Sequence, residues 1–181
     1  MLQEFVQQVK TVVSDMINEV HTAMPGTINS FDPGTGLASV TPSGKFRTPD
    51  GKQLDYPAIT GVPVVIPQSS MVQIAFPVSP GDSCLLIMSE RELDSWLYGR
   101  EEADGKLKFD LTSAIAIPGL LNRGSTALAE ACSNGSVVIS AGASKLSVSA
   151  SGVTITGSVT ITGNISISGN ISCGGSFPCN A

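Results

Sequence analysis

The sequence predicts an all-β protein with an N-terminal helix, built as a small antiparallel barrel followed by an intertwined triangular β-helix (a β-prism) in a homotrimer. Three observations predict it: an amphipathic stretch at the start, short apolar segments between strong turn signals in the middle, and a six-residue glycine-marked repeat near the end. The chain divides accordingly into an N-terminal helix, a barrel domain, a neck or start of the β-helix, and a trimeric β-helix with its tip, at residues 1–24, 25–122, 123–152 and 153–181.

Apolar residues recur every three or four positions in the first 20 residues, which is the spacing of one helix face. Pro25 and Gly26 end this predicted helix. The helix either covers its own domain or serves as an oligomerisation or docking helix, and the breadth of its apolar stripe favours the second reading. The stripe comprises Leu2, Phe5, Val6, Val9, Val12, Val13, Met16, Ile17 and Val20.

The middle region reads as short strands between turns. Proline presets φ and glycine accepts positive φ at three turn signals, Asp32-Pro33-Gly34, Pro49-Asp50-Gly51 and Pro80-Gly81-Asp82. The spacing of the apolar segments between them is typical of a small antiparallel barrel. Cys84 is expected to be a small core residue. The expected strands are Val62–Ile66, Met71–Phe76, Cys84–Met88 and Ile115–Ile117.

From residue 153 onward, apolar residues occupy odd-numbered positions, and Ser, Thr and Asn occupy most of the even ones. This alternation places the apolar side chains on one face of a strand. Glycines recur every six residues, where the chain would turn a corner. Such a fixed period is typical of a β-solenoid. The corner glycines are Gly157, Gly163, Gly169 and Gly175.

One chain has about four such repeats, too few to cover their own apolar face. Three chains around a common axis would each supply one wall of a triangular prism, and strand edges would pair with a neighbouring chain. We therefore favour the trimeric prism over a single-chain solenoid or a low-complexity linker. Its predicted core comprises Val153, Ile155, Val159, Ile161, Ile165, Ile167 and Ile171.

Composition permits a packed core and argues against nucleic acid as a partner. Hydrophobic residues make up 41% of the chain and charged residues 14%, where charged residues average about 25% in globular domains. The formal net charge of −5 lacks the basic surplus that nucleic-acid binding needs. No apolar run approaches the roughly 18 residues of a membrane-spanning helix, and no export signal is evident, so we expect synthesis in the cytoplasm.

Catalysis is hard to build from these residues. His21 is the only histidine, so one chain cannot assemble a histidine-based metal cluster. The nucleophile-elbow, zinc-protease and phosphate-loop patterns are absent, and the four cysteines form no C-x-x-C pair. We therefore expect no enzyme activity, no catalytic residue, no cofactor and no metal site.

Five segments of the middle region follow one another in a recognisable order. They are Met24-Pro-Gly-Thr-Ile-Asn-Ser-Phe-Asp-Pro, Val62-Pro-Val-Val-Ile-Pro, Ala75-Phe-Pro-Val-Ser-Pro-Gly-Asp, Met88-Ser-Glu-Arg-Glu-Leu-Asp-Ser-Trp and Phe109-Asp-Leu-Thr-Ser-Ala-Ile-Ala-Ile-Pro-Gly-Leu. Together they resemble the N-terminal domain of the central baseplate spike proteins of contractile-tailed phages. The resemblance covers residues 20–122.

The resemblance implies an OB-like, trimeric barrel that continues into a triangular β-helix, the membrane-piercing needle. It implies a tail hub or tube protein as partner at the barrel end and the host outer membrane as target. A separate tip-capping protein is a further candidate partner. The implied location is the baseplate of a phage tail or tail-like particle assembled in a bacterial cytoplasm. The implied role is mechanical: sheath contraction drives the spike through the membrane.

The sequence departs from that family at the tip. Relatives commonly end in a His-x-His motif whose three copies bind iron, but no histidine follows His21 here, so no metal site is carried over. The inward register ends instead with Cys173, Phe177 and Cys179. The cysteines are read first as reduced apolar fillers, next as a disulfide staple, and last as thiolate metal ligands.

Two other functions compete with a spike. A tail fibre or adhesin domain would bind a cell-surface receptor, but its tip usually carries exposed aromatic residues, and this C-terminus has only Phe177. An acyltransferase with a left-handed β-helix needs more coils and usually a catalytic histidine. The spike is therefore the favoured interpretation.

Overall fold

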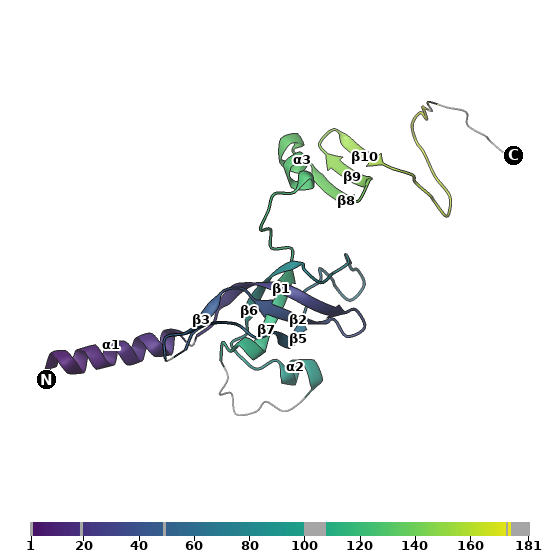
Figure 1. Cartoon of the computed structure of the whole chain (residues 1–181). Coiled ribbons are helices and arrows are strands. Elements are labelled where there is room, and N and C mark those ends of the chain that lie inside the picture. Colours follow the sequence, from purple (N-terminus) through teal and green to yellow (C-terminus); the bar gives the residue numbers. More distant parts are fainter. Residues whose placement is uncertain (1, 19, 49, 100–107, 173, 175–181) are drawn as a thin grey trace. The chain divides into compact units, whose positions relative to one another are not determined.

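The computed structural model describes residues 2–18, 20–48, 50–99, 108–172 and 174, and their regular secondary structure is mostly β-strand, preceded in the chain by an N-terminal helix (Figure 1). The mostly-β class with an N-terminal helix is therefore confirmed. The chain divides into two compact units, Met1–Asn122 and Arg123–Ala181. Met1–Asn122 holds the N-terminal helix and a curled sheet, whereas Arg123–Ala181 holds a short helix and a three-stranded sheet.

Helix α1 spans Leu2–Asn18, in agreement with the predicted amphipathic helix. From Phe5 to Ile17 its apolar stripe is exposed, with exposed fractions that run from 44% at Val9 to 65% at Ile17. This exposure does not favour the interpretation in which the helix covers its own domain. After the helix, the backbone amide of His21 donates to the carbonyl of Phe109 at 3.2 Å, and the His21 ring meets Tyr56 edge-on.

Five strands make a curled half-barrel: β1 (Ala23–Asp32), β2 (Leu37–Pro42), β5 (Ile59–Pro63), β6 (Ser83–Met88) and β7 (Ala114–Pro118). Their order is β5-β2-β1-β6-β7, and every neighbouring pair is antiparallel. The two ends of the sheet meet, because Val64 forms a parallel bridge with Ala116 and the amide of Val65 donates to the carbonyl of Ala116 at 2.9 Å. The edges of the sheet thereby approach closure, as in a partly open five-stranded barrel.

The alternating burial of β2 and β6 places every second side chain inside the half-barrel. Cys84 is buried there as predicted, and burial raises the pKa of its thiol. Gly26 on β1 keeps the centre narrow, since a Cβ on it would lie 2.9 Å from Cγ1 of Val40. The buried apolar residues are Ile28, Ala38, Val40, Val62, Cys84, Leu86, Met88, Ala114 and Ala116.

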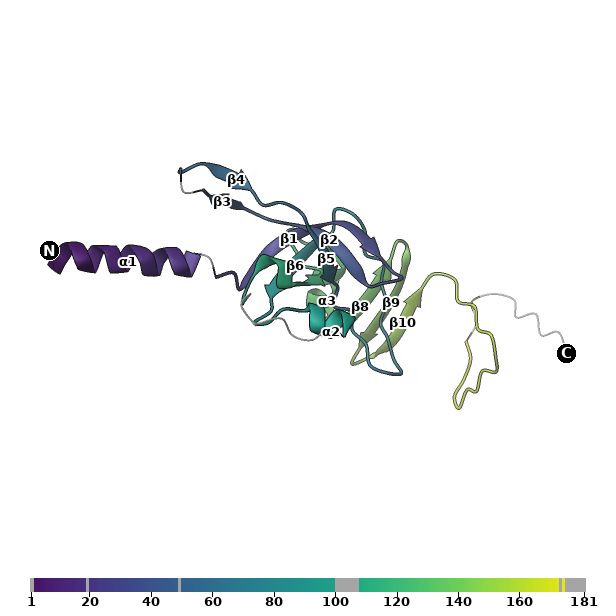
Figure 2. The same cartoon turned by 90° about the horizontal axis from the view of Figure 1, so that it is seen from below.

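The remaining elements of Met1–Asn122 are short. Strands β3 (Lys45–Arg47) and β4 (Gln53–Asp55) form a hairpin that extends from the barrel (Figure 2). Helix α2 (Asp94–Tyr98) is a short helix that ends at Gly99 in the left-handed conformation. The 3-10 turn η1 (Leu111–Ser113) is capped by Asp110. The side-chain hydroxyl and backbone amide of Thr112 both donate to that carboxylate and lower its pKa, with a smaller contribution from the charge of His21.

One expected strand is wrong: Met71–Phe76 lies in a loop. The β-pairing in this loop is a single isolated bridge between Gln68 and Gln73, which does not extend into a strand. The apolar alternation predicts a strand, but Pro67 and Pro77 flank the segment and cannot donate to a ladder. A turn is formed instead, in which the amide of Ser69 donates to the carbonyl of Val72 at 2.7 Å. The expected strand Val62–Ile66 is also displaced, since β5 begins earlier and ends at Pro63.

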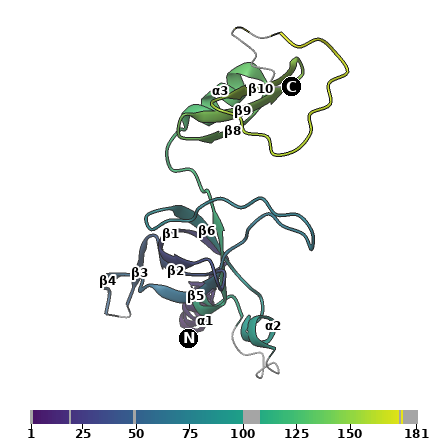
Figure 3. The same cartoon turned by 90° about the vertical axis from the view of Figure 1, so that its right-hand side faces the viewer.

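Residues 123–152 hold a helix that the sequence analysis did not predict. Helix α3 (Thr126–Asn134) begins after Ser125, whose hydroxyl accepts from the amide of Leu128 at 3.0 Å, and it ends at Gly135 in the left-handed conformation. Strands β8 (Val137–Ala141), β9 (Ser144–Ser149) and β10 (Gly152–Thr156) follow as an antiparallel sheet in the order β10-β9-β8. In Figure 3, α3 lies beside this sheet.

Candidate assembly interface

The seven predicted core positions of the prism lie in an exposed part of the chain. Val153 and Ile155 fall on β10 and pair with Val148 and Leu146 of β9. The other five follow in residues 157–172, which contain no named strand. All seven are more than half exposed, from 52% at Ile167 to 64% at Val153. A single chain therefore leaves all seven of these side chains in contact with solvent.

The corner glycines differ in backbone conformation. Gly157 and Gly163 have φ values of 121° and 135°, a region that favours glycine, whereas Gly169 has no positive φ. Gly157 is also crowded, because a Cβ there would lie 3.0 Å from Oγ of Ser144. Gly175 and the tip residues Cys173, Phe177 and Cys179 lie outside the described residues.

The sheet β8–β10 presents six apolar side chains on one face, which we call the open face. Cross-strand pairing arranges them in two rows, one through Val148 and one through Leu146. All except Leu146 are more than 40% exposed. The first row is Val137, Val148 and Val153, and the second is Ile139, Leu146 and Ile155.

The sequence analysis missed four residues of the open face, because the apolar residues move from odd-numbered positions on β8 to even-numbered positions on β9. These residues are Val137, Ile139, Leu146 and Val148. Two-residue turns at 142–143 and 150–151 join the strands, so odd positions of β8 pair with even positions of β9 and then with odd positions of β10. If the two turns are ignored, the alternation of apolar and polar residues is interrupted at Gly142 and Lys145. The signal that could have revealed it is the glycine turn with alternating residues on both sides.

The opposite face of the same sheet faces α3. Lys145 pairs across the strands with Ser140 and Thr156, and its neighbour Leu146 points to the open face. Nζ of Lys145 lies 2.6 Å from Oε1 of Glu130 on α3, and both side chains are about two-thirds buried, with 31% and 32% exposed. This ion pair fixes which face the helix occupies.

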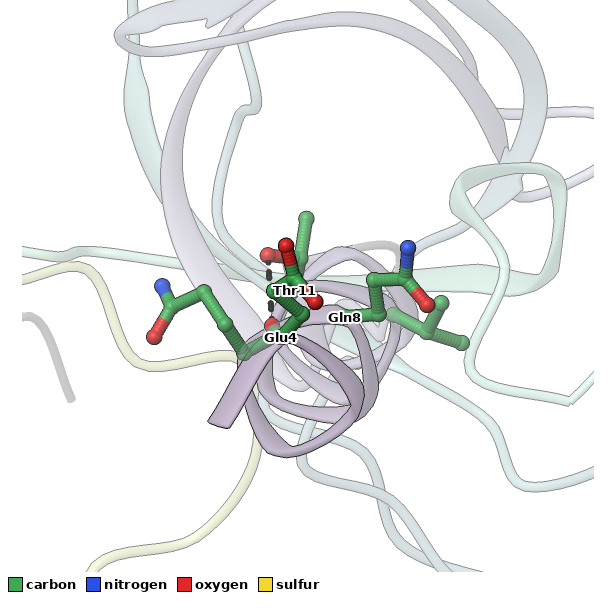
Figure 4. Close-up of a pocket in the computed structure, with 5 residues that line it drawn as sticks. Glu4, Gln8 and Thr11 are labelled. Carbon is green, nitrogen blue, oxygen red and sulfur yellow. Dashed lines mark hydrogen bonds between the residues drawn. The ribbon is translucent and has the colours of Figure 1, made fainter. Parts of the chain in front are cut away.

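A shallow hollow on α1 is lined by Glu4, Gln7, Gln8, Thr11 and Val12 (Figure 4). All five belong to one helix, so the hollow encloses nothing. Among the described residues, no group of acidic, histidine and cysteine side chains could hold a metal ion, and no helix is long and apolar enough to cross a membrane.

The barrel carries its own exposed apolar segment on the loop between β5 and β6. Met71 is 93% exposed, Val72 67% and Ile74 66%. Apolar side chains gathered at one loop tip are typical of a contact surface for another protein.

A family model described as the phage protein Gp138 N-terminal domain matches residues 24–119, slightly more than half of the chain. These residues include the half-barrel from β1 to β7, apart from Ala23 at the start of β1. No curated protein matches the chain.

Proposed function

Because the chain belongs to the phage protein family of the Gp138 N-terminal domain, and is thus a virion-associated structural protein, we propose that it forms the central spike of a contractile tail. Three copies would wind residues 153–181 into a membrane-piercing needle on the baseplate of the phage or tail-like particle. The barrels would attach this needle to the tail hub, and sheath contraction would drive it through the host outer membrane.

The observation that carries this proposal is the uncovered inward register. Each fully buried valine or isoleucine stabilises a fold by about 2 kcal/mol, yet the seven residues remain more than half exposed in one chain. The alternation places all seven on one face of an extended segment, and one short segment cannot cover that face by itself. Two further copies of the chain present the same apolar face in the same register. The three faces can therefore cover one another around a common axis.

The composition of the segment supports a piercing role. After Lys145 the chain has no charged side chain, and the outward positions are mainly Ser, Thr and Asn. Charged groups are costly inside a membrane, whereas hydroxyl groups are much less so. A needle with an uncharged surface would therefore cross the hydrocarbon layer at a lower cost than a charged one.

The exposed loop supports attachment at the barrel end. Met71, Val72 and Ile74 gather there without covering any core. We assign this loop to the contact with the tail hub. Variants in which all three become serine should still form the needle but should lose the spike from purified baseplates.

The experiment uses particles that carry variants of the chain. Two charged substitutions are compared at neighbouring positions: Ile165→Lys in the inward register, and Ser166→Lys in the outward one. We expect Ile165→Lys to prevent spike assembly, because three ammonium groups would meet at the axis. Ser166→Lys should assemble on the baseplate but slow the release of a periplasmic enzyme from target cells.

Adsorption separates the spike from the adhesin. Particles that lack the protein should still bind cells but fail to puncture them. If such particles fail to bind cells, the receptor-binding alternative is correct. If they bind and puncture normally, the spike proposal is wrong.

A further inference from the structure

We propose that the trimeric prism begins at β8 rather than at β10. In this arrangement, three copies of the β8–β10 sheet pack their open faces around the needle axis, and each α3 lies outside. The inference rests on the proposed homotrimer, and it extends the interface by four residues per chain, namely Val137, Ile139, Leu146 and Val148.

The first step is that the open face has the side-chain composition of a protein interior. Its two cross-strand rows contain only valine, isoleucine and leucine. Such pairs stabilise a sheet mainly when the face is covered. Yet Val137 is 65% exposed and Ile139 62%. An uncovered patch of this kind on a small three-stranded sheet indicates a missing partner.

The second step is that only this face is available. The other face is held against α3 by the ion pair between Lys145 and Glu130. A helix from the same chain therefore covers one side of the sheet and leaves the other for contact. Lys145, the last charged residue in the sequence, points away from the open face.

The third step identifies the partner as further copies of the same chain. Val153 and Ile155 belong both to the open face and to the inward register of the needle, so the two surfaces are continuous along the chain. Where the needle residues face the axis, the rest of the open face must face it too. Charge gives no reason for a different partner, because all six side chains are aliphatic. The edge strands β8 and β10 would then meet those of the neighbouring copies.

The experiment measures thiol reactivity in the full-length protein. Ile139→Cys places a thiol on the open face, and Thr154→Cys places a matched thiol on the opposite face of β10, at a position that α3 leaves exposed. Each variant is treated with a bulky maleimide in the presence of a phosphine reductant, and modification at that residue is read by peptide mass. We expect Ile139→Cys to react about tenfold or more slowly than Thr154→Cys, because buried groups react only when the structure opens.

A second measurement covers the case in which the thiol variant alters packing. Ile139→Asp and Thr154→Asp are compared by the urea concentration at which the trimer dissociates. Ile139→Asp should dissociate at a clearly lower concentration, and Thr154→Asp should match the unmodified protein.

The outcomes separate the two proposals. A trimer in which the thiols at 139 and 154 react equally, and in which the two aspartate variants dissociate alike, overturns this inference but leaves the homotrimeric spike intact. A monomeric protein contradicts both. Slow reaction at 139 together with early dissociation of Ile139→Asp supports the extended prism.

Discussion

Truncation of one inward side chain distinguishes a trimeric prism from a free single chain. The change is Ile165→Ala, and its matched control is Ser166→Ala at the next, outward position. In one chain, Ile165 is already 63% exposed, so removing its side chain would cost only about 0.5–1 kcal/mol. In the prism the same side chain is buried, and its truncation costs about 2–5 kcal/mol at each site.

Threefold symmetry multiplies this difference. Three truncated sites remove about 6–15 kcal/mol from one trimer, whereas Ser166→Ala removes only an exposed hydroxyl. The assay is urea unfolding at several protein concentrations, followed by circular dichroism. The midpoint should rise with protein concentration, because association stabilises only the folded trimer. Ile165→Ala should lower it far more than Ser166→Ala. Equal midpoints for both variants, with no dependence on concentration, would refute the reasoning.

Three further predictions concern the structure around the interface. Gly26→Ala should destabilise the barrel by about 1–3 kcal/mol through overpacking, and Gly124→Ala, with open space around it, should not; urea midpoints check both. Because the pKa of Asp110 is lowered in the fold, its carboxylate should stabilise the barrel at neutral pH and lose this effect as the pH falls below about 4, so Asp110→Asn should flatten the acid limb of a thermal-melting profile. Glu130→Gln should cost about 1–2 kcal/mol, because it leaves the mostly buried Lys145 without its charged partner, and calorimetry at low and high salt should show that this loss decreases as salt is added.

The needle pattern could be predicted from the sequence because it is local. From Val153 to Ile171 the alternation runs without a change of parity, so face and register follow from counting. The same signal continues upstream into β8 and β9, but two turns reverse the parity there. Pairing across a turn is needed to see that Ile139 and Leu146 lie on one face.

The loop at Met71–Phe76 shows where the alternation misleads. Its pattern resembles that of a strand, but strand formation also requires a partner that can receive the hydrogen bonds. Pro67 and Pro77 remove donors at both ends. Burial is a property of the tertiary fold, so the sequence alone could not reveal that these apolar side chains remain exposed.

Helix α3 was missed for a different reason, since its signals are present. Ser125 and Gly135 occupy the two ends, where Ser is favoured as a cap and Gly as the left-handed residue after the last turn. The apolar residues between them are mainly alanine, with Leu128 as the only large one, and this gives little helical periodicity. Capping residues deserve equal weight with periodicity in a segment of this length.

Sedimentation equilibrium of the full-length protein at micromolar concentration tests the central claim most directly. The account predicts a single species with three times the 18.6 kDa mass of one chain. A folded species of 18.6 kDa across the whole concentration range would contradict it.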